Sequence, residues 1–161
     1  MADEAKKEIN LDEKVTVKNL AGWEVSFSRK AEGIGDVLIN PNGSYRLSRN
    51  EIIAQVQSGN RLFSGTDGLG SHATIFIDDV PTRKEVGFES EDGKTKQKIF
   101  SDKLVQKLFG YATQANFENA VQTFIITRAE KYAIIEAVKR LKLNDYSKIR
   151  FIEKYTGYKL D

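Results

Sequence analysis

Apolar and polar residues alternate along much of the first hundred positions, which is the spacing of half-buried β-strands. The alternation runs through residues 15–20 and again through residues 23–27. Between these two segments stands Ala21-Gly22, a dipeptide that favours a tight turn. The pattern therefore predicts two strands joined as a hairpin, with Trp23, the only tryptophan, as a core anchor.

Further short strands are predicted at 37–39, 73–77, 86–88 and 97–99. Asn40-Pro41-Asn42-Gly43 is a strong turn signal, because proline presets φ and Asn-Gly tolerates positive φ. Ser48 and Glu51 match a capping box and predict a short helix that ends at Gly59. Six or seven strands at this spacing predict a small, mostly antiparallel β-barrel or sandwich over residues 14–100.

From Ser101 onward the apolar spacing changes to the 3.6-residue period of helices. One stripe covers 104–109 and a second covers 117–125. Thr127 and Glu130 form another capping box, and a last helix is expected to end at Gly157. Residues 101–161 thus predict about four helices packed on, or extending from, the β module, and the fold class is α+β.

Charge follows the same division. Residues 1–100 have 14 Lys/Arg and 16 Asp/Glu, whereas residues 101–161 have 11 and 7. Residues 1–13 carry charges of both signs without apolar periodicity, so a flexible arm is expected there. Opposite charge on the two halves favours head-to-tail contacts between copies or adhesion to a larger particle.

Composition excludes several classes of protein. The sequence has no cysteine, which removes disulfides, thiolate nucleophiles and cysteine metal sites. Its apolar runs are too short to cross a bilayer. The first residues lack the apolar segment of a secretory signal, so we expect a cytoplasmic protein at synthesis with no membrane partner.

A glycine-rich loop separates the predicted helix near residue 56 from the strand at 73–77. Its glycines do not follow the dinucleotide-binding order and they precede a strand, so no nucleotide cofactor is expected. Loops on a rigid scaffold often contact partners. The partner contact is therefore predicted at Gly65, Asp67, Gly68 and Gly70.

No catalytic motif stands out. His72 is the only histidine, which excludes a histidine-rich metal cage. Asp67, His72 and Asp78 are the one constellation that an enzyme could use, but no nucleophile accompanies them. We expect no enzyme activity, no cofactor and no metal, and place an enzyme third among the possible functions.

Basic residues interleaved with aromatic ones mark the C-terminal helices. A nucleic-acid-binding regulator is the alternative function, because such a face can contact phosphates and stack on bases. Its candidate residues are Lys139, Arg140, Lys142, Lys148 and Arg150. Ordinary helical packing is favoured over this interpretation, since a net charge of +2 is small for a protein that binds nucleic acid by charge.

In its general pattern, the sequence resembles small bacteriophage-encoded virion or accessory proteins. The resemblance rests on the strand-and-turn pattern over 21–79 and the helical end over 127–160. The resemblance implies a virion component, such as a capsid-associated or head-tail neck protein. Its partners would be other protein subunits, copies of itself or a larger viral particle, and its final location would be the virion. The leading prediction is therefore a non-enzymatic structural or assembly protein.

Overall fold

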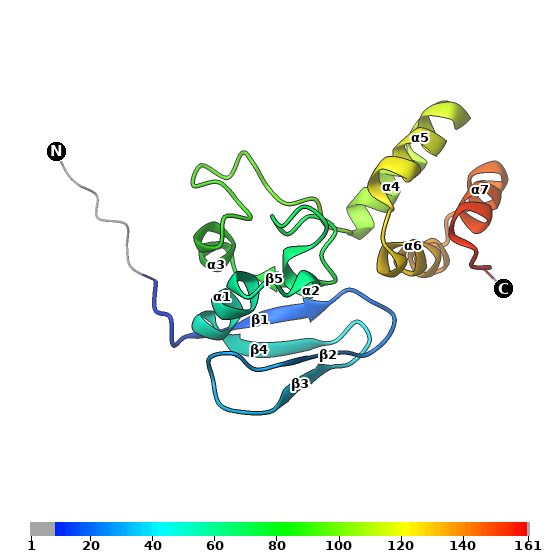
Figure 1. Ribbon diagram of the computed structural model, residues 1–161. Coiled ribbons are helices and arrows are strands. Elements are labelled where there is room, and N and C mark those ends of the chain that lie inside the picture. Colours follow the sequence, from blue (N-terminus) through cyan, green and yellow to red (C-terminus); the bar gives the residue numbers. More distant parts are fainter. Residues whose placement is uncertain (1–8, 161) are drawn as a thin grey trace.

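The structure, a computed structural model, describes residues 9–160. Five strands and seven helices lie within this range (Figure 1). The strands are β1 (Lys14–Asn19), β2 (Val25–Ser28), β3 (Asp36–Ile39), β4 (Ser44–Ser48) and β5 (Ile75–Asp78). The helices are α1 (Arg49–Gln57), α2 (Arg61–Ser64), α3 (Val80–Glu85), α4 (Asp102–Phe109), α5 (Gln114–Phe124), α6 (Arg128–Arg140) and α7 (Tyr146–Thr156).

The strands form two small antiparallel sheets. β1 is the centre of a three-stranded sheet in the order β4-β1-β5, and β2 pairs with β3 in a separate sheet. The predicted hairpin between residues 15–20 and 23–27 is therefore wrong. The chain turns at Ala21-Gly22, as the sequence indicates, but it passes there from one sheet to the other.

The buried side chain of Asn19 explains this passage. Its amide nitrogen donates to the carbonyl oxygens of Trp23, Ile39 and Asn40, and its oxygen accepts from the Ala21 N–H. These four bonds satisfy a side chain that is only 1% exposed. They fix the end of β1 beside the end of β3 and direct β2 away from β1.

The predicted α+β class is confirmed. The strands of the described residues form two small sheets, and these sheets do not close into a barrel. The strands expected at 86–88 and 97–99 reduce to one isolated bridge between Glu89 and Lys96. Helix α3 occupies residues 80–85 instead, with Asp79 as its N-cap and Pro81 in its first turn. Both residue types are common at helix starts, so the sequence did contain the signal for α3.

The predicted helices of the second half are confirmed as α4, α5, α6 and α7. Thr127 and Glu130 form both hydrogen bonds of the capping box at α6. Gly157 ends α7 with φ of +80°, a left-handed conformation that glycine adopts without strain. No helix in the described part of the chain is long and apolar enough to span a membrane.

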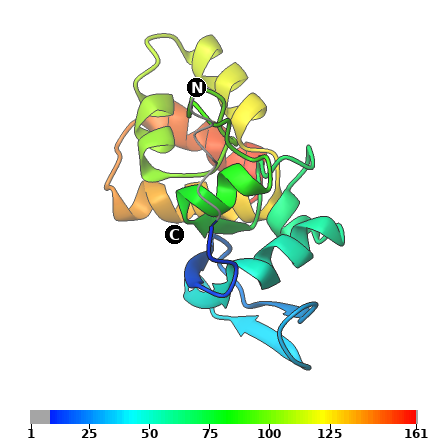
Figure 2. The ribbon, with the colours of Figure 1, turned by 90° about the vertical axis from the view of Figure 1, so that its left-hand side faces the viewer.

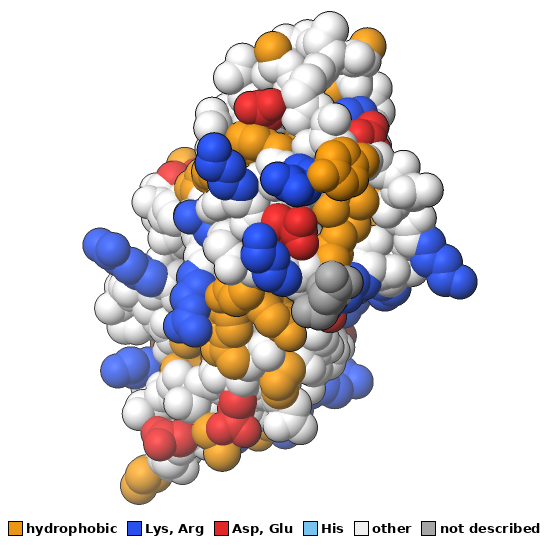
Figure 3. All heavy atoms as spheres, turned by 90° about the vertical axis from the view of Figure 1, so that its right-hand side faces the viewer, with side chains coloured by type: hydrophobic (Ala, Val, Ile, Leu, Met, Phe, Trp, Pro, Cys, Tyr) orange, Lys and Arg blue, Asp and Glu red, His pale blue; other side chains and the backbone are white. Residues whose placement is uncertain are grey.

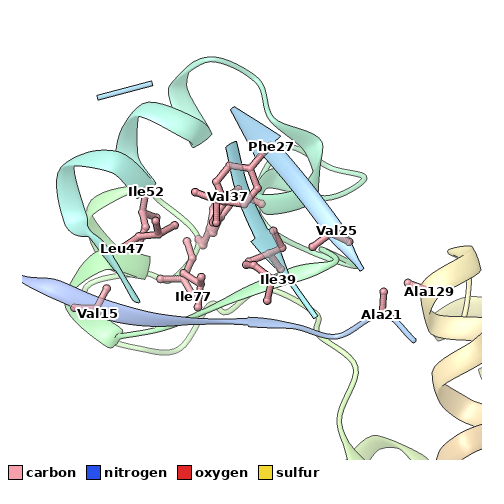
Figure 4. Close-up of a cluster of buried hydrophobic side chains, with 14 residues drawn as sticks. Val15, Ala21, Val25, Phe27, Val37, Ile39, Leu47, Ile52, Ile77 and Ala129 are labelled. Carbon is pink, nitrogen blue, oxygen red and sulfur yellow. The ribbon is translucent and has the colours of Figure 1, made fainter. Parts of the chain in front are cut away.

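Two hydrophobic clusters correspond to the two halves. Side chains from all five strands, α1 and α2 form the first, and α4 to α7 form the second. Ala129 of α6 belongs to the first cluster, where Figure 4 shows it facing Ala21. Helix α6 therefore packs against both halves.

The first eight residues of the predicted arm lie outside the described residues. Of the rest, Leu11 and Glu13 accept hydrogen bonds from the backbone N–H groups of Asn50 and Arg49. Glu13 also pairs with the Arg49 guanidinium at 2.9 Å. Residues 11–13 thus lie against the first turn of α1.

Candidate protein interaction surface

The β2–β3 hairpin presents apolar side chains to solvent. In β3, Val37 and Ile39 point into the core, whereas Leu38 on the opposite face is 55% exposed. Ile34, in the connection between the strands, is 100% exposed. Figure 2 shows the hairpin at the end of the molecule opposite α4 and α5. We call residues 29–35 the hairpin tip.

A buried carboxylate holds the hairpin tip in place. Glu51, fully buried in the first turn of α1, accepts hydrogen bonds from the backbone N–H groups of Lys30, Ala31 and Glu32 at 2.9–3.0 Å. The side-chain amide of Gln55, one turn later, also donates to Glu51 and to the carbonyl oxygen of Ser28. Helix α1 therefore fixes the first half of the tip through backbone atoms.

The environment of Glu51 favours its charged form. Burial alone raises the pKa of this carboxyl, but the hydrogen bonds from Glu32, Ala31, Lys30 and Gln55 outweigh burial, so the pKa lies below its ordinary value of 4.5. The positive end of the α1 dipole acts in the same direction. At neutral pH the tip is tied to a carboxylate ion, and charge-assisted hydrogen bonds of this kind are stronger than neutral ones.

The glycine-rich loop is a compact turn closed by its own hydrogen bonds. Asp67 accepts from the N–H groups of Leu69 and Ser71, and Gly70 donates to the carbonyl oxygen of Ser64. A Cβ on Gly65 would lie 2.0 Å from the Ser71 oxygen, and one on Gly70 would lie 2.6 Å from the Phe88 ring. These two glycines are thus required by close packing.

Other parts of the same loop face solvent. A Cβ on Gly68 would meet no atom within 4 Å, although its φ of +75° favours glycine. Leu69 beside it is 56% exposed. The pKa of Asp67 is lowered, because the hydrogen bonds from Leu69 and Ser71 outweigh the opposing effect of burial. The predicted partner contact at Gly65, Asp67, Gly68 and Gly70 remains a prediction, with Leu69 as its most exposed apolar side chain.

The residues of the enzyme alternative have separate partners. Nδ1 of His72, in the first half of the chain, lies 2.7 Å from Oε2 of Glu130 in the second half. Asp78 pairs with Lys18 at 3.3 Å. Asp79, the next residue, caps α3 and pairs with the buried Arg49 at 3.0 Å.

Among the five candidate nucleic-acid residues, Lys148 is buried, and its ammonium donates to the carbonyl oxygens of Phe109 and Tyr111. Arg140 pairs with Asp102, Lys139 lies 3.5 Å from Glu136, and Arg150 donates to the Tyr146 hydroxyl. Lys142, with φ of +53°, follows α6. Figure 3 shows basic side chains of the helical side scattered among acidic and apolar ones.

Helix α6 docks on the β module through its first two turns. The Tyr132 ring packs edge-on against Trp23, with centroids 5.9 Å apart, and the Arg128 guanidinium lies over the indole at 4.8 Å. Gly22 lets the Tyr132 ring approach, since a Cβ there would lie 1.8 Å from a ring carbon. These contacts, with the His72–Glu130 pair, form what we call the junction.

Sequence reasoning did not identify Ile34 or the role of Glu51. The signal for Ile34 was an apolar residue between Gly33 and Gly35 inside a polar connection; both glycines have positive φ. Glu51 was interpreted as half of a capping box. Ser48 does accept from the Glu51 N–H, but the Glu51 carboxylate binds the hairpin tip. Which distant segment it binds could not be read from local sequence.

No protein-family model, curated protein or solved structure shows a significant match to this chain.

Proposed function

We propose that the chain is a non-enzymatic assembly protein that binds another protein subunit through the hairpin tip and the outer face of β3. The observation that carries the proposal is Ile34, a branched apolar side chain that is 100% exposed in the hairpin tip, next to the residues 30–32 that Glu51 of α1 binds. Buried apolar anchors provide most of the affinity of an interface.

The proposed setting is a bacteriophage virion, with the chain as a capsid-associated or head-tail neck protein. Support for this setting is the general resemblance of the sequence and the presence of exposed apolar side chains on a hairpin at one end of the molecule. A subunit inside a particle contacts its neighbours at fixed places, and such projections suit heterologous contacts between subunits.

The test is the mass of the purified chain in solution, measured by light scattering up to ~1 mM, the Kd range of weak association. Wild type should form oligomers, and Ile34→Asp should remain monomeric, because a carboxylate cannot be buried unpaired at the contact. Leu69→Asp is the matched control, as Leu69 is also exposed but lies in the glycine-rich loop. Circular dichroism should show the same fold for all three.

Two outcomes contradict the proposal. Loss of association in Leu69→Asp alone would place the contact in the glycine-rich loop. A wild-type chain that stays monomeric and binds DNA or RNA tightly and with steep salt dependence would favour the nucleic-acid alternative. That alternative is supported by a groove of about 580 Å³ beside α5 and α7, which Arg150, Lys154, Lys159 and Phe151 line together with Glu118 and Glu153.

A further inference from the structure

A cavity of about 250 Å³ lies between the two halves of the chain. His72 and the segment 97–99 line it from the β module, while Leu104, Phe124 and Glu130 line it from α4, α5 and α6. The cavity shares no residue with the hairpin tip, so a ligand bound in it would be independent of the proposed function.

One wall of the cavity is a histidine oriented by a carboxylate. His72 has a side chain 9% exposed and a φ of +60°, a conformation uncommon for a residue with a Cβ. Glu130 faces its Nδ1 and also accepts from the N–H groups of Ile126 and Thr127 at 3.1 Å. The Glu130 carboxylate is thus held by hydrogen bonds, and Nε2 of His72 has no hydrogen-bond partner among the residues that the structure describes.

A cation lies beside the same cavity. Lys98 lines it, and its ammonium is 5.9 Å from the centroid of the Phe124 ring. Within residues 9–160, no acidic side chain pairs with this ammonium. The neighbouring Gln97 donates to the Gly70 carbonyl, but its buried side-chain oxygen accepts no hydrogen bond from any described residue.

We propose that this cavity binds a small organic anion, an aryl or branched alkyl carboxylate. The Lys98 ammonium would meet the carboxylate, and the hydrocarbon part would pack on Leu104 and Phe124. At ~30 Å³ per water, the volume equals about eight waters, which suits one ring with one short acidic substituent. Polar groups at one side of an apolar cavity are the usual design of small-molecule sites.

The test uses phenylacetate as the probe and phenylacetamide as its neutral isostere, each titrated into isotope-labelled full-length protein and followed by NMR. Phenylacetate should bind saturably with Kd of about 1 mM or tighter, the range expected for a ten-atom ligand. The largest shifts should occur at His72, Lys98 and Phe124. Phenylacetamide should bind at least ~10-fold more weakly, since it lacks the charge.

Lys98→Met should weaken phenylacetate binding about tenfold without changing the affinity for phenylacetamide. Lys96→Met is the matched control, because Lys96 is an exposed cation two residues away that does not line the cavity. Four results would each overturn the proposal. They are an equal loss of phenylacetate affinity in both variants, equal binding of the two probes, NMR shifts confined to other surfaces, and no saturation by phenylacetate up to ~10 mM.

Discussion

Two glutamates show how much a single buried carboxylate can organise in this molecule. Glu51 and Glu130 occupy the same position, the third residue of a helix, and each accepts hydrogen bonds from a segment far away in the sequence. Glu51 binds the hairpin tip, and Glu130 binds His72. The positive end of the helix dipole stabilises a carboxylate at this position, which makes it suitable for both tasks.

Glu51→Gln should destabilise the fold by roughly 1.5–3 kcal/mol, since an amide cannot replace a charged group that accepts hydrogen bonds from four donors. The amides of Lys30, Ala31 and Glu32 should also exchange faster with solvent. Chemical denaturation and hydrogen exchange measure the two effects. Glu24→Gln is the control and should change neither, because Glu24 is an exposed carboxylate directly before β2. Equal losses in both variants would refute the role of Glu51.

The contribution of Glu51 to stability depends on pH, and the direction of this dependence can be predicted. Because the pKa of Glu51 is lower in the folded state than its ordinary value of 4.5, the stability that it adds is fully present above pH 4.5. It is lost as pH falls through the folded-state pKa. The stability difference between wild type and Glu51→Gln should therefore shrink in acid, and a difference that grows in acid would contradict the assignment.

At the scale of elements, the local signals of the second half predicted its helices correctly, whereas α3 and the strand partners were not predicted. The apolar stripes of α4 and α5, the capping box of α6 and Gly157 after α7 depend on residues within a few positions of one another. Strand pairing depends on distant contacts. The Asn19 side chain decides it at β1 by binding carbonyl groups that lie as far as 21 residues away.

The two proposed sites could not be predicted from the sequence for the same reason. The exposure of Ile34 follows from how the hairpin is folded, and the cavity beside His72 exists only where residues 97–99 meet three helices. The glycine-rich loop was correctly placed between a helix and a strand. The glycine content alone could not show that the Asp67 side chain closes the loop by accepting hydrogen bonds from Leu69 and Ser71.

The docking of α6 makes a prediction about Gly22. Gly22→Ala should destabilise the protein by about 1–3 kcal/mol, because the new methyl group overlaps the Tyr132 ring. In a Tyr132→Ala background the same substitution should cost little, so the two changes should be strongly non-additive. Chemical denaturation of wild type, the two single variants and the double variant gives the double-mutant cycle. Additive costs would show that Tyr132 does not pack on Gly22.

At the scale of the whole molecule, two cores are joined by one turn of chain and one junction. The connecting turn over 89–98 is largely exposed, with Ser90 and Asp92 closing it through hydrogen bonds. The junction includes Ala129 within the first core and the contact of Tyr132 with Trp23. The halves are therefore held together by packing as well as by the chain.

Limited trypsin digestion should cut first at Lys94 or Lys96 within the described chain, where the backbone is exposed. The two fragments should still elute together under native conditions and separate only in denaturant. Gel filtration followed by mass spectrometry distinguishes these states. First cleavage inside β5, or fragments that separate at once, would contradict this arrangement.

The strand order β4-β1-β5 also determines when the first half can fold during synthesis. Its central strand is the first to leave the ribosome, yet its two neighbours end at Ser48 and Asp78. Until Asp78 has emerged, one edge of β1 has no partner and exposes free backbone groups that other chains can bind. The nascent chain therefore passes through a vulnerable interval of about thirty residues, during which a chaperone or a slow rate of elongation has its largest effect on yield.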